Sequence, residues 1–92
     1  MNIYIINIII HYMLTKKQVI SCISKALKVP SSKININLSD KDFDKWDSLG
    51  HLEILMNLDK ALKGKAIKIK DLAQAHSVKK IFSVLKKNKL LN

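Results

Sequence analysis

Residues 44–56 read Asp-Lys-Trp-Asp-Ser-Leu-Gly-His-Leu-Glu-Ile-Leu-Met, and this stretch decides the fold that the sequence predicts. Asp47 and Ser48 favour a helix N-terminus, because their short side-chain oxygens accept hydrogen bonds from the unpaired backbone N–H groups there. Apolar residues then recur at spacings that predict one face of a helix. These are Leu49, Leu52, Leu55, Met56 and Leu62. The stretch therefore predicts a loop that turns into an amphipathic helix, with the Ser48 hydroxyl at the turn.

The position of Ser48 has two interpretations. As a helix-start residue it needs no chemistry at all, since serine is common there. A phosphate ester on its hydroxyl would also be stabilised, because the N-terminus of a helix carries a partial positive charge and unpaired N–H groups. Both interpretations place the hydroxyl at the same point of the fold.

Before this stretch, the sequence predicts one helix and a long loop. Thr15 and Gln18 form a capping-box pattern at the start of the helix, which ends before Pro30. The apolar stripe of this helix consists of Val19, Ile20, Ile23, Ala26 and Leu27. Residues 31–47 form the loop, and its apolar residues are expected to anchor it to the core, with Trp46 packed against the bundle. The loop residues in question are Ile34, Ile36, Leu38 and Phe43.

After Ser48, the sequence predicts three helices. The first runs from Ser48 to about Lys63, with Gly64 as its C-cap. A short helix over residues 71–75 follows, and Ser77 is a good N-cap for a last helix. The stripe of that helix is Val78, Ile81, Phe82 and Leu85, and residues 90–92 are expected to fray. The predicted fold class is all-α, a small four-helix bundle with a long first loop and a short third helix.

The charge of the chain is large and uneven. All 17 basic residues are lysines, and the net charge is +10. Residues 40–60 contain six acidic residues and three lysines, a net charge of −3, whereas the rest of the chain carries +13. The acidic segment surrounds Ser48, which suits a protein whose partners present basic surfaces. The alternative is that aspartates simply favour a loop and a helix start.

The excess of lysine also suggests a rival function, a basic helical module that binds nucleic acid or an anionic membrane through residues 63–70 and 79–89. The absence of arginine weakens this hypothesis, because arginine is the usual residue for bidentate contacts to phosphates and bases. We therefore expect no nucleic-acid partner and no stable membrane insertion.

The sequence predicts no enzyme and no metal site. His11, His51 and His76 lack metal-ligand spacing among themselves or with Cys22, and no phosphate-binding loop or catalytic triad is recognisable. His51 is expected to face solvent, with contact to a phosphate near Ser48 as the alternative. The single cysteine excludes an internal disulfide and suits a reducing cytoplasm, and we expect it to be a small buried group on the first helix.

Residues 1–12 are apolar and differ from the rest of the chain. The run is about half of the ~20 residues that a membrane-spanning helix needs. It also lacks the basic start and small-residue cleavage site of a signal peptide. We expect Met13 to be the native start, which makes residues 1–12 an N-terminal extension and residues 13–92 the domain.

The residues around Ser48 resemble a known family. Asp47-Ser48-Leu49 at the start of an amphipathic helix resembles the Asp-Ser-Leu motif of acyl carrier proteins, and residues 46–53 are similar to free-standing, specialised carriers. The helix order and the length of the first loop agree with this family over about residues 15–87. The resemblance implies that Ser48 carries 4′-phosphopantetheine, whose thiol holds an acyl, or less commonly aminoacyl, group as a thioester.

The resemblance also implies roles for neighbouring residues and partners. Asp47 and Leu49 would belong to the motif that a phosphopantetheinyl transferase recognises, and Glu53, Met56 and Asp59 would contact partner enzymes. These partners are an acyl-loading ligase or synthase and acyltransferases of fatty acid or secondary metabolite biosynthesis. The protein would be a cytoplasmic monomer. Its cargo would lie between helices, against Leu55, Leu62 and Ile69, or remain exposed. The lysine-rich surface departs from this usually acidic family and implies dedicated partners.

Overall fold

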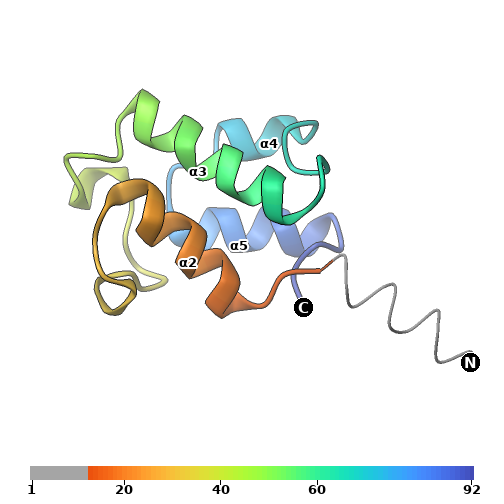
Figure 1. The fold of residues 1–92 in the computed structure, drawn as a ribbon, viewed down its shortest axis with the longest axis horizontal. Coiled ribbons are helices and arrows are strands. Elements are labelled where there is room, and N and C mark those ends of the chain that lie inside the picture. The colour runs from red at the N-terminus through yellow and green to blue at the C-terminus, as the bar shows by residue number, and fades with distance from the viewer. Residues whose placement is uncertain (1–12) are drawn as a thin grey trace, which may run out of the picture.

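The structure, a computed structural model, describes residues 13–92 and is an all-α bundle, as the sequence predicts. Figure 1 shows three longer helices packed together, with the short helix α4 beside α3. The elements are α2 (Lys16–Leu27), η1 (Ser31–Lys33), η2 (Asp40–Asp42), α3 (Ser48–Ala61), α4 (Lys70–Ala73) and α5 (Val78–Lys87). The expected extension over residues 1–12 lies outside the described residues.

Helix α2 begins and ends where the sequence predicts. The Thr15 hydroxyl accepts a hydrogen bond from the backbone N–H of Gln18, and the Gln18 side chain accepts one from the N–H of Thr15. This reciprocal pair satisfies two donors that the first turn leaves unpaired. The helix ends at Lys28, which adopts the left-handed conformation (φ 58°) two residues before Pro30.

The loop between α2 and α3 is ordered by two short 3₁₀ turns and by apolar anchors. Ile34 is buried, and Leu38 and Phe43 pack against the core as predicted, whereas Ile36 is 45% exposed and the expectation for it is wrong. The backbone also fastens the loop to the segment before α5. Asp40 N–H donates to the carbonyl of His76, and Val78 N–H donates to that of Leu38. These bonds bring the acidic loop close to the end of α4.

Helix α3 buries a different face from the one that the sequence predicts. Leu49, Leu52 and Met56 are exposed, whereas His51, Ile54 and Leu58 are buried. At 100° per residue, the two sets lie about half a turn apart on the helix. Leu62, the C-cap of α3, is buried with the second set. Apolar residues occupy both sides of this helix, so spacing alone does not decide which side faces the core.

The end of α3 and the segment that follows it agree only in part with the prediction from the sequence. Helix α3 ends at Ala61 with Leu62 as its C-cap, so the predicted C-cap at Gly64 is wrong. Lys63 (φ 55°) and Gly64 (φ 89°) follow in left-handed conformations and turn the chain. The short helix α4 spans Lys70–Ala73 and begins one residue earlier than predicted. Ser77 caps α5 by accepting a hydrogen bond from Lys80 N–H, and the predicted apolar stripe of α5 is buried.

The C-terminal tail does not fray. Leu90 and Leu91 are buried, and the tail pairs with the residue before α2. Leu14 N–H donates to the carbonyl of Leu90, and Asn92 N–H donates to that of Leu14. The tail therefore ends beside the start of α2 (Figure 1). The expectation of fraying is wrong because the two leucines complete the core.

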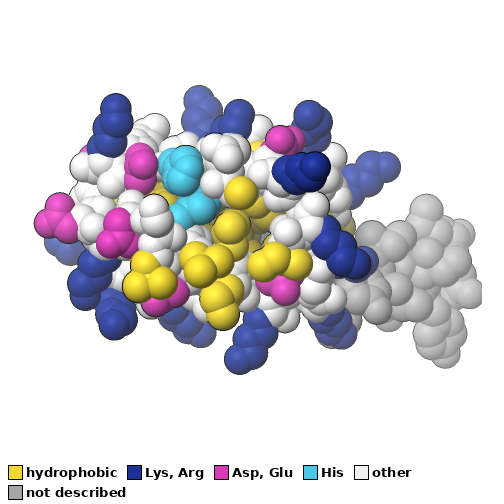
Figure 2. All heavy atoms as spheres, turned by 90° about the horizontal axis from the view of Figure 1, so that it is seen from above, with side chains coloured by type: hydrophobic (Ala, Val, Ile, Leu, Met, Phe, Trp, Pro, Cys, Tyr) yellow, Lys and Arg dark blue, Asp and Glu magenta, His cyan; other side chains and the backbone are white. Residues whose placement is uncertain are grey.

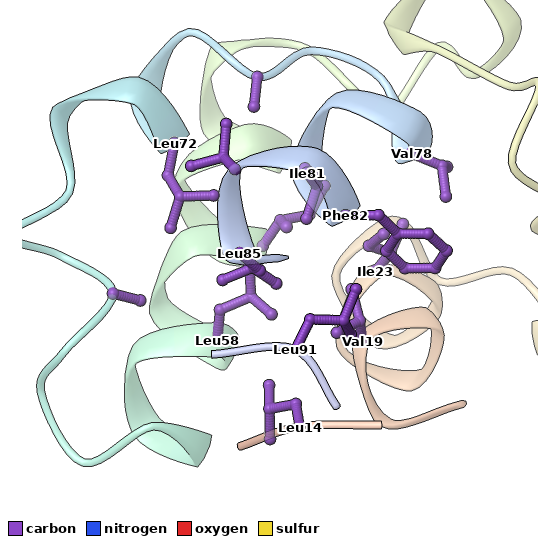
Figure 3. Packing of buried hydrophobic residues seen from close by; sticks show 14 of the residues in the cluster. Leu14, Val19, Ile23, Leu58, Leu72, Val78, Ile81, Phe82, Leu85 and Leu91 are labelled. Atoms are coloured by element: carbon purple, nitrogen blue, oxygen red, sulfur yellow. The ribbon is translucent and has the colours of Figure 1, made fainter. Parts of the chain in front are cut away.

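The core lies between α2, α3 and α5, with α4 contributing Leu72 (Figure 3). Its fully buried side chains come from all four helices and the end of α3. The largest are Ile23, Leu27, Ile54, Leu58, Leu62, Leu72, Ile81 and Leu85. No helix in residues 13–92 is long and apolar enough to cross a membrane.

Candidate functional site

Ser48 is the first residue of α3 and lies at the surface. Asp47 before it is extended (φ −93°, ψ −167°), and its Oδ1 accepts a hydrogen bond of 2.8 Å from Gly50 N–H. The carbonyl of Asp47 accepts the His51 N–H at 2.8 Å and begins the helix. Asp47 therefore caps α3, as the sequence predicts. The exposed hydroxyl of Ser48 stands at the positive end of the helix dipole.

Gly50 allows the chain to turn tightly into α3. A Cβ atom at this position would collide with the backbone carbonyl oxygen of Lys45. The loop therefore passes over the first turn of the helix at a distance that only glycine permits. The glycine fixes the direction from which residues 45–47 approach Ser48.

Trp46 and His51 are both buried and hydrogen-bonded to each other beneath this turn. The indole Nε1–H of Trp46 lies 3.0 Å from His51 Nδ1, and His51 Nε2 lies 2.9 Å from the carbonyl oxygen of Leu72. His51 is 5% exposed, so the expectation of a solvent-facing histidine is wrong. Contact with a phosphate near Ser48 is also overturned, because both ring nitrogens already have partners inside the fold.

Burial lowers the pKa of His51 below its ordinary value of 6.5. The bond to the Leu72 carbonyl opposes this effect, and so does the charge of Asp40, whereas the charge of His76 adds to it. The His76 ring lies against the His51 ring, with centroids 4.4 Å apart and planes tilted by 41°. At neutral pH the His51 side chain is therefore uncharged. It cannot serve as a base toward Ser48, because its acceptor nitrogen holds the Trp46 N–H.

The exposed apolar side chains of α3 form a surface that begins next to Ser48. We call Leu49, Leu52, Met56 and Ile67 the apolar strip; they are 46–65% exposed, and Ile67 belongs to the connector after α3. Figure 2 shows hydrophobic side chains gathered on this side of the molecule, with acidic groups nearby and lysines around the edge. Of the predicted site residues, Leu49 and Met56 lie in the strip, and neither contributes to the core.

The two predicted acidic contact residues have different settings. Glu53 is half-buried and lines a hollow of about 150 Å³ with Lys28, Lys45 and Leu49, directly beside the Ser48 turn. Asp59 is also half-buried, and its Oδ1 accepts a hydrogen bond of 2.9 Å from Ile67 N–H. Asp59 therefore holds the connector that carries one end of the apolar strip, a role that sequence reasoning missed.

The residues expected to line a cargo site are part of the packed interior. Leu62 is 1% exposed, and Leu55 and Ile69 are half-buried against the core cluster. Cys22 is half-buried on α2 rather than fully buried, and burial raises the pKa of its thiol. Across residues 13–92, no group of three or more His, Cys, Asp or Glu side chains is arranged to hold a metal ion.

Sequence reasoning placed Asp47, Ser48 and Leu49 at the start of α3 but missed the pairing of Trp46 with His51. A usable signal was present, since two amphipathic rings five positions apart flank the helix start. The third partner, the Leu72 carbonyl, belongs to the backbone and leaves no trace in the sequence. Comparisons of the chain with protein-family models, curated proteins and solved structures found no match.

Proposed function

We propose that this protein is an acyl carrier protein in which Ser48 bears 4′-phosphopantetheine, with the cargo held as a thioester on the cofactor thiol. The observation that carries this proposal is an exposed serine that opens a capped helix, after a long ordered loop in a four-helix bundle. The resemblance of residues 46–53 to specialised carriers supports the same function. The protein itself would not be an enzyme.

In this proposal the carrier itself activates no reacting group. The modifying transferase activates the Ser48 hydroxyl, so the carrier needs no base of its own. What the chain supplies is an accessible hydroxyl, a fixed turn made by Asp47 and Gly50, and a positive helix terminus beside the phosphodiester. The flexible cofactor then carries the acyl group, while the protein provides position and recognition.

Partner recognition would use the apolar strip and the acidic residues beside it. Met56 offers an adaptable apolar contact, and Glu53 offers a charge for a basic partner surface. The partners would be the transferase, a loading ligase or synthase and an acyltransferase, in the cytoplasm. The net charge of +13 outside residues 40–60 favours enzymes dedicated to this carrier over general fatty-acid enzymes.

The test is intact mass after the full chain is incubated with coenzyme A and a broad-specificity phosphopantetheinyl transferase. We expect a gain of one phosphopantetheine in the wild type and in Ser32→Ala, an exposed loop serine used as a matched control. Ser48→Ala should show no gain. Modification that persists in Ser48→Ala would contradict the site. A folded wild type that is unmodified, both after this incubation and when purified from its own host, would contradict the function.

The charge distribution favours one second candidate, the basic helical module. Two stretches rich in lysine, residues 63–70 and 79–89, would bind a phosphate backbone or an anionic membrane. Such binding would weaken steeply with added salt, because each neutralised phosphate releases a counterion. It would also be indifferent to Ser48→Ala. Titration of duplex DNA and anionic vesicles at two salt concentrations, with wild type and Ser48→Ala, separates the two candidates.

A further inference from the structure

A buried polar link joins the loop before Ser48, the first turn of α3 and the short helix α4. Trp46 is 3% exposed, His51 5% and Leu72 0%. The link consists of the contact between Trp46 Nε1 and His51 Nδ1 and the contact between His51 Nε2 and the Leu72 carbonyl oxygen. Along the chain it spans Ser48, since Trp46 precedes that serine and His51 follows it.

The chemistry of the partners fixes the protonation state of His51. Indole Nε1–H can only donate, so Nδ1 of His51 must be the acceptor. The Leu72 carbonyl can only accept, so Nε2 must carry the hydrogen. Only the neutral Nε2–H tautomer therefore satisfies both bonds. A proton added at Nδ1 would place two N–H groups against each other in a buried site, and the Trp46 contact would be lost.

Helix α4 is held by packing against α3 and α5 and by the bond from His51. It contains four residues, and Ile69 at its N-cap makes no side-chain capping bond. A helix this short is unstable without tertiary contacts. Leu72 in α4 and Ala75 just after it are buried. The Leu72 carbonyl accepts hydrogen bonds from both His51 Nε2–H and the Ala75 N–H.

We propose that His51 is a pH-dependent positioning residue. In its neutral form it fastens the loop before Ser48 to the first turn of α3 by accepting the Trp46 N–H, and when protonated at Nδ1 it releases Trp46 while its Nε2–H keeps the bond to the Leu72 carbonyl. The role belongs to the fold and does not depend on what Ser48 carries. A failure of this proposal would therefore be distinguishable from a failure of the carrier function. In the open state, the loop that ends at Trp46 would move independently of the first turn of α3.

The groups around His51 favour loss of the Trp46 contact as the pH falls. The Trp46 indole and the Leu72 carbonyl are uncharged. The titratable groups are His76, from the connector before α5, and Asp40, from η2, which is tied to His76 through its backbone. Burial, the largest effect, lowers the pKa of His51 below 6.5. The closed state is therefore fully favoured above pH 6.5. Below it, each pH unit down to the folded-state pKa reduces the closed-to-open ratio by about tenfold.

The test combines two measurements on the full wild-type chain. Ring ¹⁵N chemical shifts should show His51 as the Nε2–H tautomer at about pH 7.5. Amide protection factors, which correct for the pH dependence of intrinsic exchange, should fall by about tenfold per pH unit below 6.5 at Trp46 and Gly50, whose N–H groups bond to Phe43 and Asp47 in the loop before α3. An Nδ1–H tautomer would overturn the proposal, and so would protection at these amides that does not change while the His51 ring titrates.

Two variants assign the effect to His51. In His51→Gln, the amide oxygen can accept the Trp46 N–H and the amide nitrogen can donate to the Leu72 carbonyl, but the side chain does not titrate. Its protection at the Trp46 amide should be independent of pH. In His76→Gln, which changes the neighbouring exposed ring, the loss of protection at low pH should remain. A loss that disappears with His76 instead would overturn the assignment. If His51→Gln does not fold, the wild-type titration still decides.

Discussion

The indole N–H of Trp46 donates a 3.0 Å hydrogen bond to Nδ1 of His51, and the two rings lie nearly parallel, with planes 13° apart. These residues stand on either side of Ser48 in the sequence, two before it and three after it. The segment that carries the exposed serine is therefore closed at both ends by a buried, directional contact. This arrangement gives a surface hydroxyl a fixed position without using the hydroxyl itself.

Trp46→Phe should separate the packing of this contact from its hydrogen bond. Phenylalanine fills part of the same space but lacks the N–H, so Nδ1 of His51 stays buried without a donor. We expect a loss of about 1–3 kcal/mol in the free energy of unfolding. The pKa of His51 should rise relative to the wild type, because a proton on Nδ1 no longer meets an N–H group. Urea unfolding followed by far-UV circular dichroism measures the free energy of unfolding, and an NMR titration measures the pKa of His51. If neither quantity changes, the Trp46–His51 hydrogen bond does not contribute as we expect.

Gly50→Ala should destabilise the protein although alanine is normally the better helix residue. In an exposed helix this change would stabilise by about 0.5–1 kcal/mol. Here the new Cβ would collide with the Lys45 carbonyl oxygen, so the loop must move and we expect a loss of about 1–3 kcal/mol. Thermal unfolding shows whether Gly50→Ala lowers or raises the stability of the protein. Ser48→Ala, at an exposed position in the same turn, should change stability by less than about 0.5 kcal/mol. A more stable Gly50→Ala protein would contradict the close approach.

The helix starts were predictable from the sequence because capping is local. Thr15, Asp47 and Ser77 each accept a hydrogen bond from an N–H group three residues later in the chain. The information needed for such a bond is contained in four consecutive residues. The end of α3 was predicted two residues too late, since the helix ends at Ala61 with Leu62 as its C-cap, although Gly64 does adopt a left-handed conformation.

The buried face of α3 was not predictable, because it depends on residues far away in the sequence. Leu49, Leu52 and Met56 have the spacing of a core stripe, yet they are exposed. His51 takes the inner face, because it meets Trp46 and the Leu72 carbonyl, which lies 21 residues further on. Burial of Leu91 against the start of α2 depends in the same way on the distant Leu14. Periodicity limits a helix to a few orientations, and tertiary partners choose among them.

The orientation of α3 can be tested with two neighbouring apolar residues. Leu58→Ala removes a fully buried side chain and should cost about 2–5 kcal/mol of unfolding free energy. Met56→Ala changes a side chain that is 56% exposed and should cost less than about 0.5 kcal/mol. Chemical denaturation of the two variants in parallel measures the difference. Equal losses, or a larger loss at Met56, would show that α3 is rotated relative to this structure.

Cys22 should react slowly with alkylating reagents in the folded protein. Burial raises the pKa of its thiol, and the nearby charge of Lys25 opposes this only in part. The thiolate is the reactive form, so at about pH 8 the folded chain should be alkylated more slowly than the urea-unfolded chain. The folded-state rate should rise by about tenfold per pH unit while the pH remains below the pKa.

Lys25→Gln removes the charge that lowers the pKa of the Cys22 thiol, and it should slow the reaction further. Mass spectrometry of iodoacetamide-treated samples measures these rates. Cys22 lies on the side of α2 that faces Asn57 of α3, and the side-chain amide of Asn57 donates a 3.0 Å hydrogen bond to the Cys22 carbonyl. A folded protein that reacts as fast as the unfolded chain would contradict this partly buried position of the thiol.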